Sequence, residues 1–113
     1  MTNNNDNLIS IEDFSKINIR IGKIIEVEII PNSDKLYKLI IDISERKIQC
    51  VAGLRDYYSP DDLKNKLVPV IINLKPAKLK GIISEGMILA AEDDESVKIL
   101  VPDGEIKLNA KIR

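Results

Sequence analysis

The strongest constraint on the fold is an alternation of apolar and polar residues that runs from Ile17 to Ile29. The odd positions of this run are all Ile or Val except Lys23, and the even positions include Arg20 and Glu26. A period of two residues over this length predicts a long β-strand with one buried face. Gly22, near the middle of the run, predicts a bulge or sharp bend, which a strand needs if it is to belong to both sides of a small barrel.

The rest of the chain predicts four further strands and two short helices. The strands are expected over residues 37–43, 47–52, 67–74 and 87–91. A helix that ends near Lys16 is expected after the cap residue Ser10, and Ser59 followed by Pro60 predicts a second helix. Pro69 predicts an edge position or the start of pairing for its strand, because proline has no backbone donor.

Three strands, a helix and two further strands follow the order of an OB-fold, an all-β five-stranded barrel. We therefore predict an OB-fold barrel with short helices and a C-terminal extension. In that extension, the turn Pro102-Asp-Gly104 separates apolar runs at residues 97–101 and 106–108. This pattern predicts a hairpin that either caps the barrel or forms a subunit contact.

Size and composition favour a single domain without catalytic residues. The 113 residues suit one domain, which we place at residues 10–113 after a disordered lead at residues 1–9. The chain has no histidine, and its one cysteine, Cys50, lies in an apolar alternation, so we expect a buried thiol, no enzyme activity, no metal site and no cofactor. A single cysteine favours a cytoplasmic location, and the apolar runs are too short for a membrane partner.

Positive charge is concentrated in one stretch of an otherwise acidic chain. Residues 63–84 contain five lysines and no acidic residue, whereas the whole chain has 17 basic and 18 acidic side chains. The remainder therefore carries 12 basic residues against 18 acidic ones. A protein with this distribution is expected to bind a polyanion at the basic stretch and to repel it elsewhere, which favours a local nucleic-acid site.

Five segments in order along the chain resemble one known family. They are Ile19–Ile24, Pro31–Leu36, Val51–Arg55, Asn73–Lys78 and Ser84–Ala91. Together they resemble the tRNA-binding domain found at the C-terminus of methionyl-tRNA synthetases, in stand-alone structure-specific tRNA-binding proteins and in EMAP-II-like polypeptides. The likeness covers roughly residues 12–113.

This resemblance implies an OB-fold that binds the outside corner of the L-shaped tRNA by shape and phosphate contacts, with little sequence preference. Free-standing members of the family are homodimers that use the region outside the barrel. Because the sequence begins and ends with the domain, we expect a stand-alone protein or a beta subunit of methionyl-tRNA synthetase. The alternative is a polypeptide-binding module like the related export chaperones. Those chaperones lack a segment like Asn73–Lys78 and diverge after the pair Ser84-Glu85, so Gly86-Met87 favours tRNA here.

The basic candidate residues lie where an OB-fold binds oligonucleotides. The loops between strands one and two and between strands four and five contain Lys35 and the group Lys75, Lys78 and Lys80. We expect the three clustered lysines to contact phosphates, against the alternative of a solvated lysine face. For Lys35 and Arg55, a phosphate contact and an ordinary surface charge are equally open.

The remaining candidates are uncharged. Asn73 either donates to the ligand or closes its strand. Ser84 and Met87 match positions that the resemblance implies in tRNA binding, with a turn residue and a filler of the barrel end as alternatives. Tyr37 is a candidate stacking platform, but three tyrosines and one phenylalanine are the only aromatic residues in the chain. This scarcity favours recognition of folded RNA by shape and backbone over the reading of unpaired bases.

Overall fold

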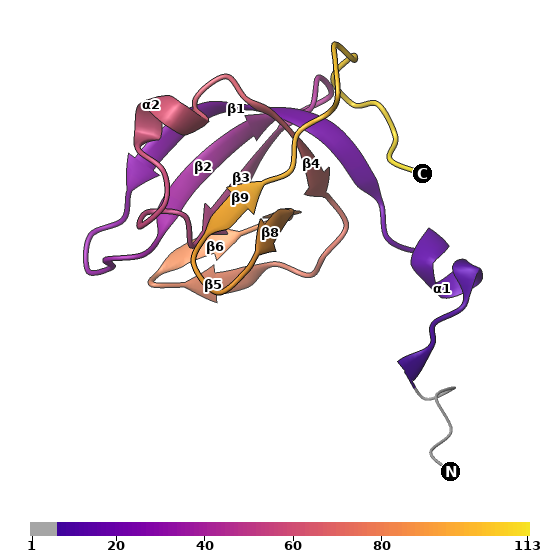
Figure 1. The fold of residues 1–113 in the computed structure, drawn as a ribbon, viewed down its shortest axis with the longest axis horizontal. Coiled ribbons are helices and arrows are strands. Elements are labelled where there is room, and N and C mark those ends of the chain that lie inside the picture. The colour runs from indigo at the N-terminus through magenta and orange to yellow at the C-terminus, as the bar shows by residue number, and fades with distance from the viewer. Residues whose placement is uncertain (1–6) are drawn as a thin grey trace.

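A five-stranded antiparallel sheet curls into a nearly closed barrel at the centre of the protein (Figure 1). The computed structural model describes residues 7–113, so positions 1–6 of the expected disordered lead lie outside the described residues. The sheet has the order β3-β2-β1-β4-β7, with bounds Ile19–Ile29 for β1, Tyr37–Asp42 for β2, Lys47–Ala52 for β3, Leu67–Ile71 for β4 and Met87–Ile88 for β7. The predicted all-β barrel of the OB-fold type is confirmed.

Strand β1 belongs to both sides of the barrel, as its length predicted. Its first half, Ile19–Lys23, pairs with β4, and from Lys23 onward it pairs with β2. The bulge lies between Ile24 and Glu26, where the register against β2 shifts, and not at Gly22. Ile24 is fully buried although it occupies an even position, so the predicted alternation is interrupted around Gly22 and Ile24 and resumes over residues 25–28, where the odd positions are again the less exposed ones.

Gly22 serves close packing rather than a bulge. A Cβ atom at this position would lie 2.5 Å from Cγ2 of Ile41 on β2 and 3.1 Å from Cγ2 of Val70 on β4. Both of these side chains are fully buried and have no room to move aside. The strand can therefore cross between its two partners only where it has no side chain.

Side-chain hydrogen bonds close the barrel between β3 and the segment Ser84–Gly86, which we call the closing segment. The backbone N–H of Val51 donates to the hydroxyl oxygen of Ser84 over 3.0 Å, and the N–H of Gln49 donates to the carboxylate of Glu85 over 2.8 Å. In return, the N–H of Glu85 donates to the carbonyl of Gln49 over 2.7 Å. These bonds satisfy backbone groups that an open sheet edge would leave unpaired.

Pro69 lies in β4 between two partner strands, yet its missing N–H leaves no partner unsatisfied. It lies opposite Ile21, whose N–H and carbonyl bond to the C-terminal tail instead of to β4. The pairing of β4 with β7 begins one residue later, at Val70. Pro69 therefore stands at the start of this pairing, as the sequence predicted.

Both short helices begin at the predicted caps. Helix α1 (Ile11–Ser15) starts after Ser10, whose hydroxyl accepts a hydrogen bond from the backbone of the third residue on, and α2 (Pro60–Leu63) starts with a capping box at Ser59. Leu63 of α2 is fully buried in the barrel core, whereas α1 buries no residue. Within residues 7–113, no helix has the length and apolar character needed to span a bilayer.

Two hairpins flank the barrel, and one of them corrects a prediction. Strands β5 (Ala77–Leu79) and β6 (Ile82–Ser84) form the first hairpin, and β8 (Ala90–Glu92) pairs with β9 (Val97–Ile99) in the second. The predicted fifth strand at 87–91 is thus divided between β7 and β8. The predicted hairpin between residues 97–101 and 106–108 is wrong, because β9 pairs backward across the turn Asp93–Ser96.

The C-terminal tail lies along the first half of β1. The N–H of Ile21 donates to the carbonyl of Ala110, and the N–H of Ile112 donates to the carbonyl of Ile19, both over 2.9 Å. Since β4 pairs with the other edge of this half-strand, the first half of β1 has hydrogen-bond partners on both sides. The tail therefore replaces β2 along the part of β1 that precedes the β1–β2 ladder, which begins at Lys23.

A glycine in the closing segment gives a test of this architecture. A Cβ atom at Gly86 would lie 2.6 Å from the carbonyl oxygen of Ile71, so the backbone of β4 or of the segment would have to move. We expect Gly86→Ala to lower the free energy of unfolding by about 1–3 kcal/mol, measured by urea denaturation. Gly104→Ala is the control, because a Cβ atom there meets no atom within 4 Å. Equal stability of the two variants would contradict this account of the closure.

Candidate nucleic-acid interface

The hairpin β5–β6 presents two lysines at an exposed arm of the protein. Lys78 is exposed on β5 opposite Ile83, and Lys80 forms the two-residue turn together with Gly81. The φ angles of Lys80 and Gly81 are 51° and 82°, so both residues adopt the left-handed conformation typical of a tight hairpin turn. Lysine is an unusual residue at such a position, where asparagine or glycine costs less. A lysine kept in a strained turn is consistent with a role in binding.

The loop between β1 and β2 is held in place by its own side chains and by Arg55. The hydroxyl oxygen of Ser33 accepts hydrogen bonds from the backbone N–H groups of Lys35 and Leu36. The guanidinium of Arg55 donates to the carbonyl of Ser33, and the backbone N–H of Arg55 donates to the carbonyl of Lys35 over 3.2 Å. Arg55 thus positions the loop that carries Lys35.

Lys35 and Lys80 meet at one hollow, although 44 positions separate them in the chain. This outer hollow has a volume of about 380 Å³ and is lined by Lys80 and by residues 32–36 of the β1–β2 loop. The lining also includes the acidic residue Asp34, so the two lysines leave a net charge of plus one, which still favours an anion such as a phosphate.

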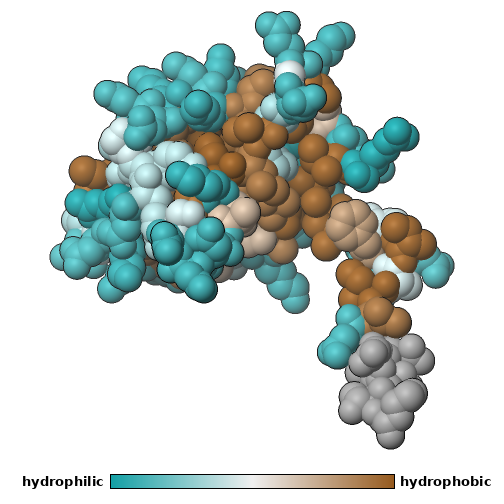
Figure 2. All heavy atoms as spheres, viewed as in Figure 1, coloured by the Kyte–Doolittle hydropathy of each residue, from teal (hydrophilic) through white to brown (hydrophobic). Residues whose placement is uncertain are grey.

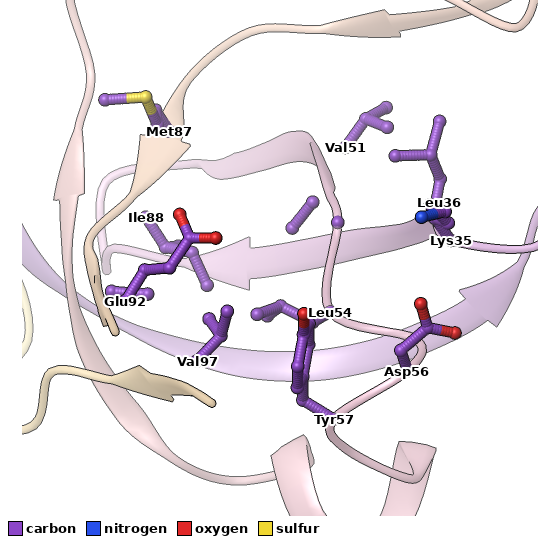
Figure 3. Close-up of a pocket in the computed structure, with 13 residues that line it drawn as sticks. Lys35, Leu36, Val51, Leu54, Asp56, Tyr57, Met87, Ile88, Glu92 and Val97 are labelled. Carbon is purple, nitrogen blue, oxygen red and sulfur yellow. The ribbon is translucent and has the colours of Figure 1, made fainter. Parts of the chain in front are cut away.

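A larger central hollow lies on the face of β3 and is drawn in Figure 3. It has a volume of about 500 Å³ and shares Lys35 and Leu36 with the outer hollow. Its apolar floor includes the buried side chains of Leu54 and Ile88. Figure 3 shows Met87 and Tyr57 on opposite sides of it.

A third, inner hollow lies under the β5–β6 hairpin. It has a volume of about 190 Å³, and its lining includes Lys75, Ser84 and Met87. The inner and central hollows share Val51 and Met87. The three hollows therefore form a row along one face, and this row brings together five of the eight predicted site residues: Lys35, Lys75, Lys80, Ser84 and Met87.

The other three predicted residues line none of these hollows. Lys78 is exposed on the same hairpin, and Arg55 is engaged with the β1–β2 loop. The side chain of Asn73 connects the end of β4 to the start of β1. Its Oδ1 atom accepts from the backbone N–H of Asn18 over 2.8 Å, and its Nδ2 atom donates to the carbonyl of Lys16 over 2.6 Å. Of the two roles left open for Asn73, the geometry supports the closing of its strand.

Tyr37 is not a stacking platform. Its ring is 3 % exposed, and its hydroxyl donates to the carbonyl of Tyr58 over 2.7 Å. The aromatic ring at the candidate interface is instead that of Tyr57, which sequence reasoning did not select. The signal for Tyr57 was its place two residues after the Val51–Arg55 motif, where the chain leaves β3.

Cys50 and Asp93, the two residues with shifted pKa values, have structural roles. Burial raises the pKa of Cys50 to about 12, the carboxylate of Glu85 adds to this rise, and a hydrogen bond with the backbone of Gly86 partly offsets it. This thiol therefore stays protonated and unreactive at neutral pH. In the β8–β9 turn, backbone hydrogen bonds from Glu95 and Ser96 lower the pKa of Asp93, so the acidic run acts as a turn.

Comparison with known proteins identifies relatives along nearly the whole chain. Residues 19–111 match the family model described as a tRNA binding domain. A methionine–tRNA ligase from Thermococcus onnurineus is 52% identical over 105 residues, which cover 93% of this chain but only 14% of the ligase. Among solved structures, a MetRS-related protein from Pyrococcus horikoshii superposes with a TM-score of 0.88 at 30% identity, covering 94% of this chain and 98% of that one. A CsaA chaperone from Picrophilus torridus gives 0.86 at 35% identity, covering 94% and 100%.

Ser84 provides a test that separates support from contact. Its hydroxyl accepts a hydrogen bond from the backbone N–H of Val51 and donates one to the carbonyl of Gly86. Ser84 as a whole is 8 % exposed. We expect Ser84→Ala to lower the free energy of unfolding by about 1–3 kcal/mol, because the N–H of Val51 loses its acceptor. Ser15→Ala, at an exposed serine of α1, is the control and should change stability by less than about 0.5 kcal/mol. Unchanged stability of Ser84→Ala in thermal or urea unfolding would contradict the closing role.

Proposed function

The chain belongs to the tRNA binding domain family, and on that premise we propose that it is a non-catalytic protein that binds tRNA by its shape and its phosphates. The observation that carries this proposal is the row of hollows on one face, with Lys35, Lys75 and Lys80 along it. Phosphate contacts position a nucleic acid without reading its sequence. Lys78, on the exposed β5–β6 hairpin, extends this cationic face beyond the barrel.

The proposed cellular context is translation. The curated relatives at about half identity are methionine–tRNA ligases, of which this chain spans about one seventh of the length. We propose that the chain acts either on its own or as a beta subunit that delivers tRNA to a methionyl-tRNA synthetase in the cytoplasm. Since none of the chemistry described above supplies a nucleophile or a general base, the contribution of this chain would be binding alone.

A second candidate function is the binding of extended polypeptide, because one structural relative is named a chaperone. The apolar floor of the central hollow would suit an unfolded segment. Two observations favour tRNA: the lysines of the β5–β6 hairpin, and the higher identity to the ligase at 52% than to the chaperone at 35%.

A charge-removal experiment tests the tRNA proposal. We expect the double variant Lys78→Gln/Lys80→Asn to bind tRNA more weakly at low salt, and the slope of log Kd against log salt to fall in magnitude by about 1.5, as for two lost phosphate contacts. Asparagine suits the left-handed turn at position 80, so the hairpin should be retained.

The matched control for this experiment is Lys64→Gln/Lys66→Gln. These exposed lysines follow α2, at the opposite end of the barrel from the hairpin (Figure 1). Binding measured by filter retention or fluorescence anisotropy should change little in the control. Absence of tRNA binding at low salt, or equal losses in the two double variants, would reject the proposal.

We further propose that the protein forms a homodimer through the surface outside the barrel. Figure 2 shows an apolar band that runs from the barrel onto α1. Ile11 is 76 % exposed, and a hollow between α1 and the C-terminal tail is lined by Phe14, Ile17 and Ile112 as well. Helix α1 buries no residue in the chain itself, so a second copy would supply the missing cover. Two tRNA-binding faces on one dimer would also gain affinity through effective concentration.

Light scattering tests the dimer. We expect the chain to have the mass of a dimer at micromolar concentration and Ile11→Lys to shift it to a monomer, because a buried charge at the centre of the apolar band is costly. Ile29→Lys is the control, since Ile29 is 56 % exposed at the far end of β1. A monomeric wild-type protein, or a dimer that tolerates Ile11→Lys, would contradict this proposal.

A further inference from the structure

The central hollow differs in charge from the lysines around it. Its lining includes the acidic residues Asp56 and Glu92 together with the basic residue Lys35. Neither carboxylate forms an ion pair within the described residues 7–113. Two carboxylates against one ammonium repel a phosphate, so the hollow is built for a part of the ligand that carries no negative charge.

The walls of the hollow suit a flat ring. Tyr57 and Met87 are each 46 % exposed, and they lie on opposite sides of the hollow (Figure 3). Leu54 and Ile88 close the floor between them. A tyrosine ring stacks on nucleobases, and a thioether packs favourably against aromatic rings. These apolar groups would leave water if a base entered between them.

The rim of the hollow offers acceptors rather than donors. A carboxylate accepts hydrogen bonds from amino and imino groups, as when Glu or Asp reads the amino group of cytosine. Figure 3 shows the carboxylate of Glu92 projecting over the hollow near Ile88. Guanine, adenine and cytosine each offer an amino group with two donor hydrogens to this rim, whereas uracil offers only its single N3–H between two carbonyl oxygens.

Lys35 connects the two charge environments. It lines both the central hollow and the outer hollow that contains Lys80. We propose that the central hollow binds one unpaired nucleobase, with preference for a base that carries an amino group, while the phosphate of the same nucleotide lies between Lys35 and Lys80. This inference rests on the proposed tRNA-binding function and adds to it a site that reads a base.

Titration with the four nucleoside monophosphates tests the proposal on the full chain. The probes are GMP, AMP, CMP and UMP, followed by two-dimensional NMR of the amide groups. The phosphate is the same in all four, so a difference in Kd reports the base alone. We expect shifts at the amides of Leu54, Tyr57 and Ile88, and an affinity for the three amino-bearing nucleotides about 5-fold or more above that for UMP.

Variants assign the effect to the hollow. We expect Tyr57→Ala to weaken GMP binding by about 5- to 100-fold, as for loss of one stacking contact, and Tyr57→Phe to restore it because the ring is kept. Glu92→Gln should reduce the preference for GMP over UMP. Asp61→Asn, which removes an exposed carboxylate from α2, should leave that preference unchanged.

The outcomes separate this inference from the proposed function. Salt-sensitive tRNA binding with no nucleotide preference and no effect of Tyr57→Ala overturns the base site and leaves the tRNA proposal in place. Loss of all nucleic-acid binding, with an unfolded lysine- or arginine-bearing peptide bound at the same amides, overturns both. Amino-base preference that is lost in Glu92→Gln supports the inference.

Discussion

The arrangement of the binding face depends on how the barrel closes. Strand β3 is the edge of the five-stranded sheet, and the closing segment Ser84–Gly86 pairs with it mainly through the side chains of Ser84 and Glu85. Hydrogen bonds from side chains hold the two segments together without a full backbone ladder between them. Because the segment lies directly between β6 and β7, it fixes the lysine hairpin on one side and Met87 on the other. Val51 and Met87 can therefore line two hollows in common.

Residues 84–87 combine two roles: Ser84 and Gly86 hold the barrel closed, and Met87 lines the hollows. Gly86 must lack a side chain because the carbonyl of Ile71 occupies the space, and Ser84 is occupied by two hydrogen bonds within the protein. Met87, one residue further, is half exposed and faces the hollows. Similarity between two proteins in Ser84–Gly86 therefore indicates the same barrel closure, whereas the residue at position 87 is the one that a ligand in the hollows would contact.

The strands and the helix caps could be predicted from the sequence because they depend on local patterns. The basic stretch was evident as well, but the fold divides it, since Lys64 and Lys66 follow α2 at the opposite end of the barrel from the hairpin. Alternation predicted β1 to β3, and Ser10 and Ser59 predicted the helix starts. The bulge after Ile24 was not predictable, since it depends on the register against β2, which is a long-range property. The pairing of β9 with β8 depends in the same way on the turn at Asp93. Tyr57 was missed because a single tyrosine in a loop has no periodicity, and only the fold brings it opposite Met87.

The charge distribution along the face restricts how an RNA could bind there. A uniformly basic surface would bind any polyanion in many orientations, because phosphate contacts carry no information about sequence or register. Here lysines outnumber carboxylates in the outer hollow, where Lys35 and Lys80 accompany Asp34, and Lys75 lines the inner one, whereas Asp56 and Glu92 outnumber Lys35 in the central hollow. In the proposed complex, the lysines would attract a phosphate backbone to the face, and the carboxylates would keep phosphates out of the middle of it. An RNA strand can satisfy both demands only if its backbone follows the lysines and an unpaired base turns inward, so the alternation of charge along the face restricts the geometry of the bound RNA.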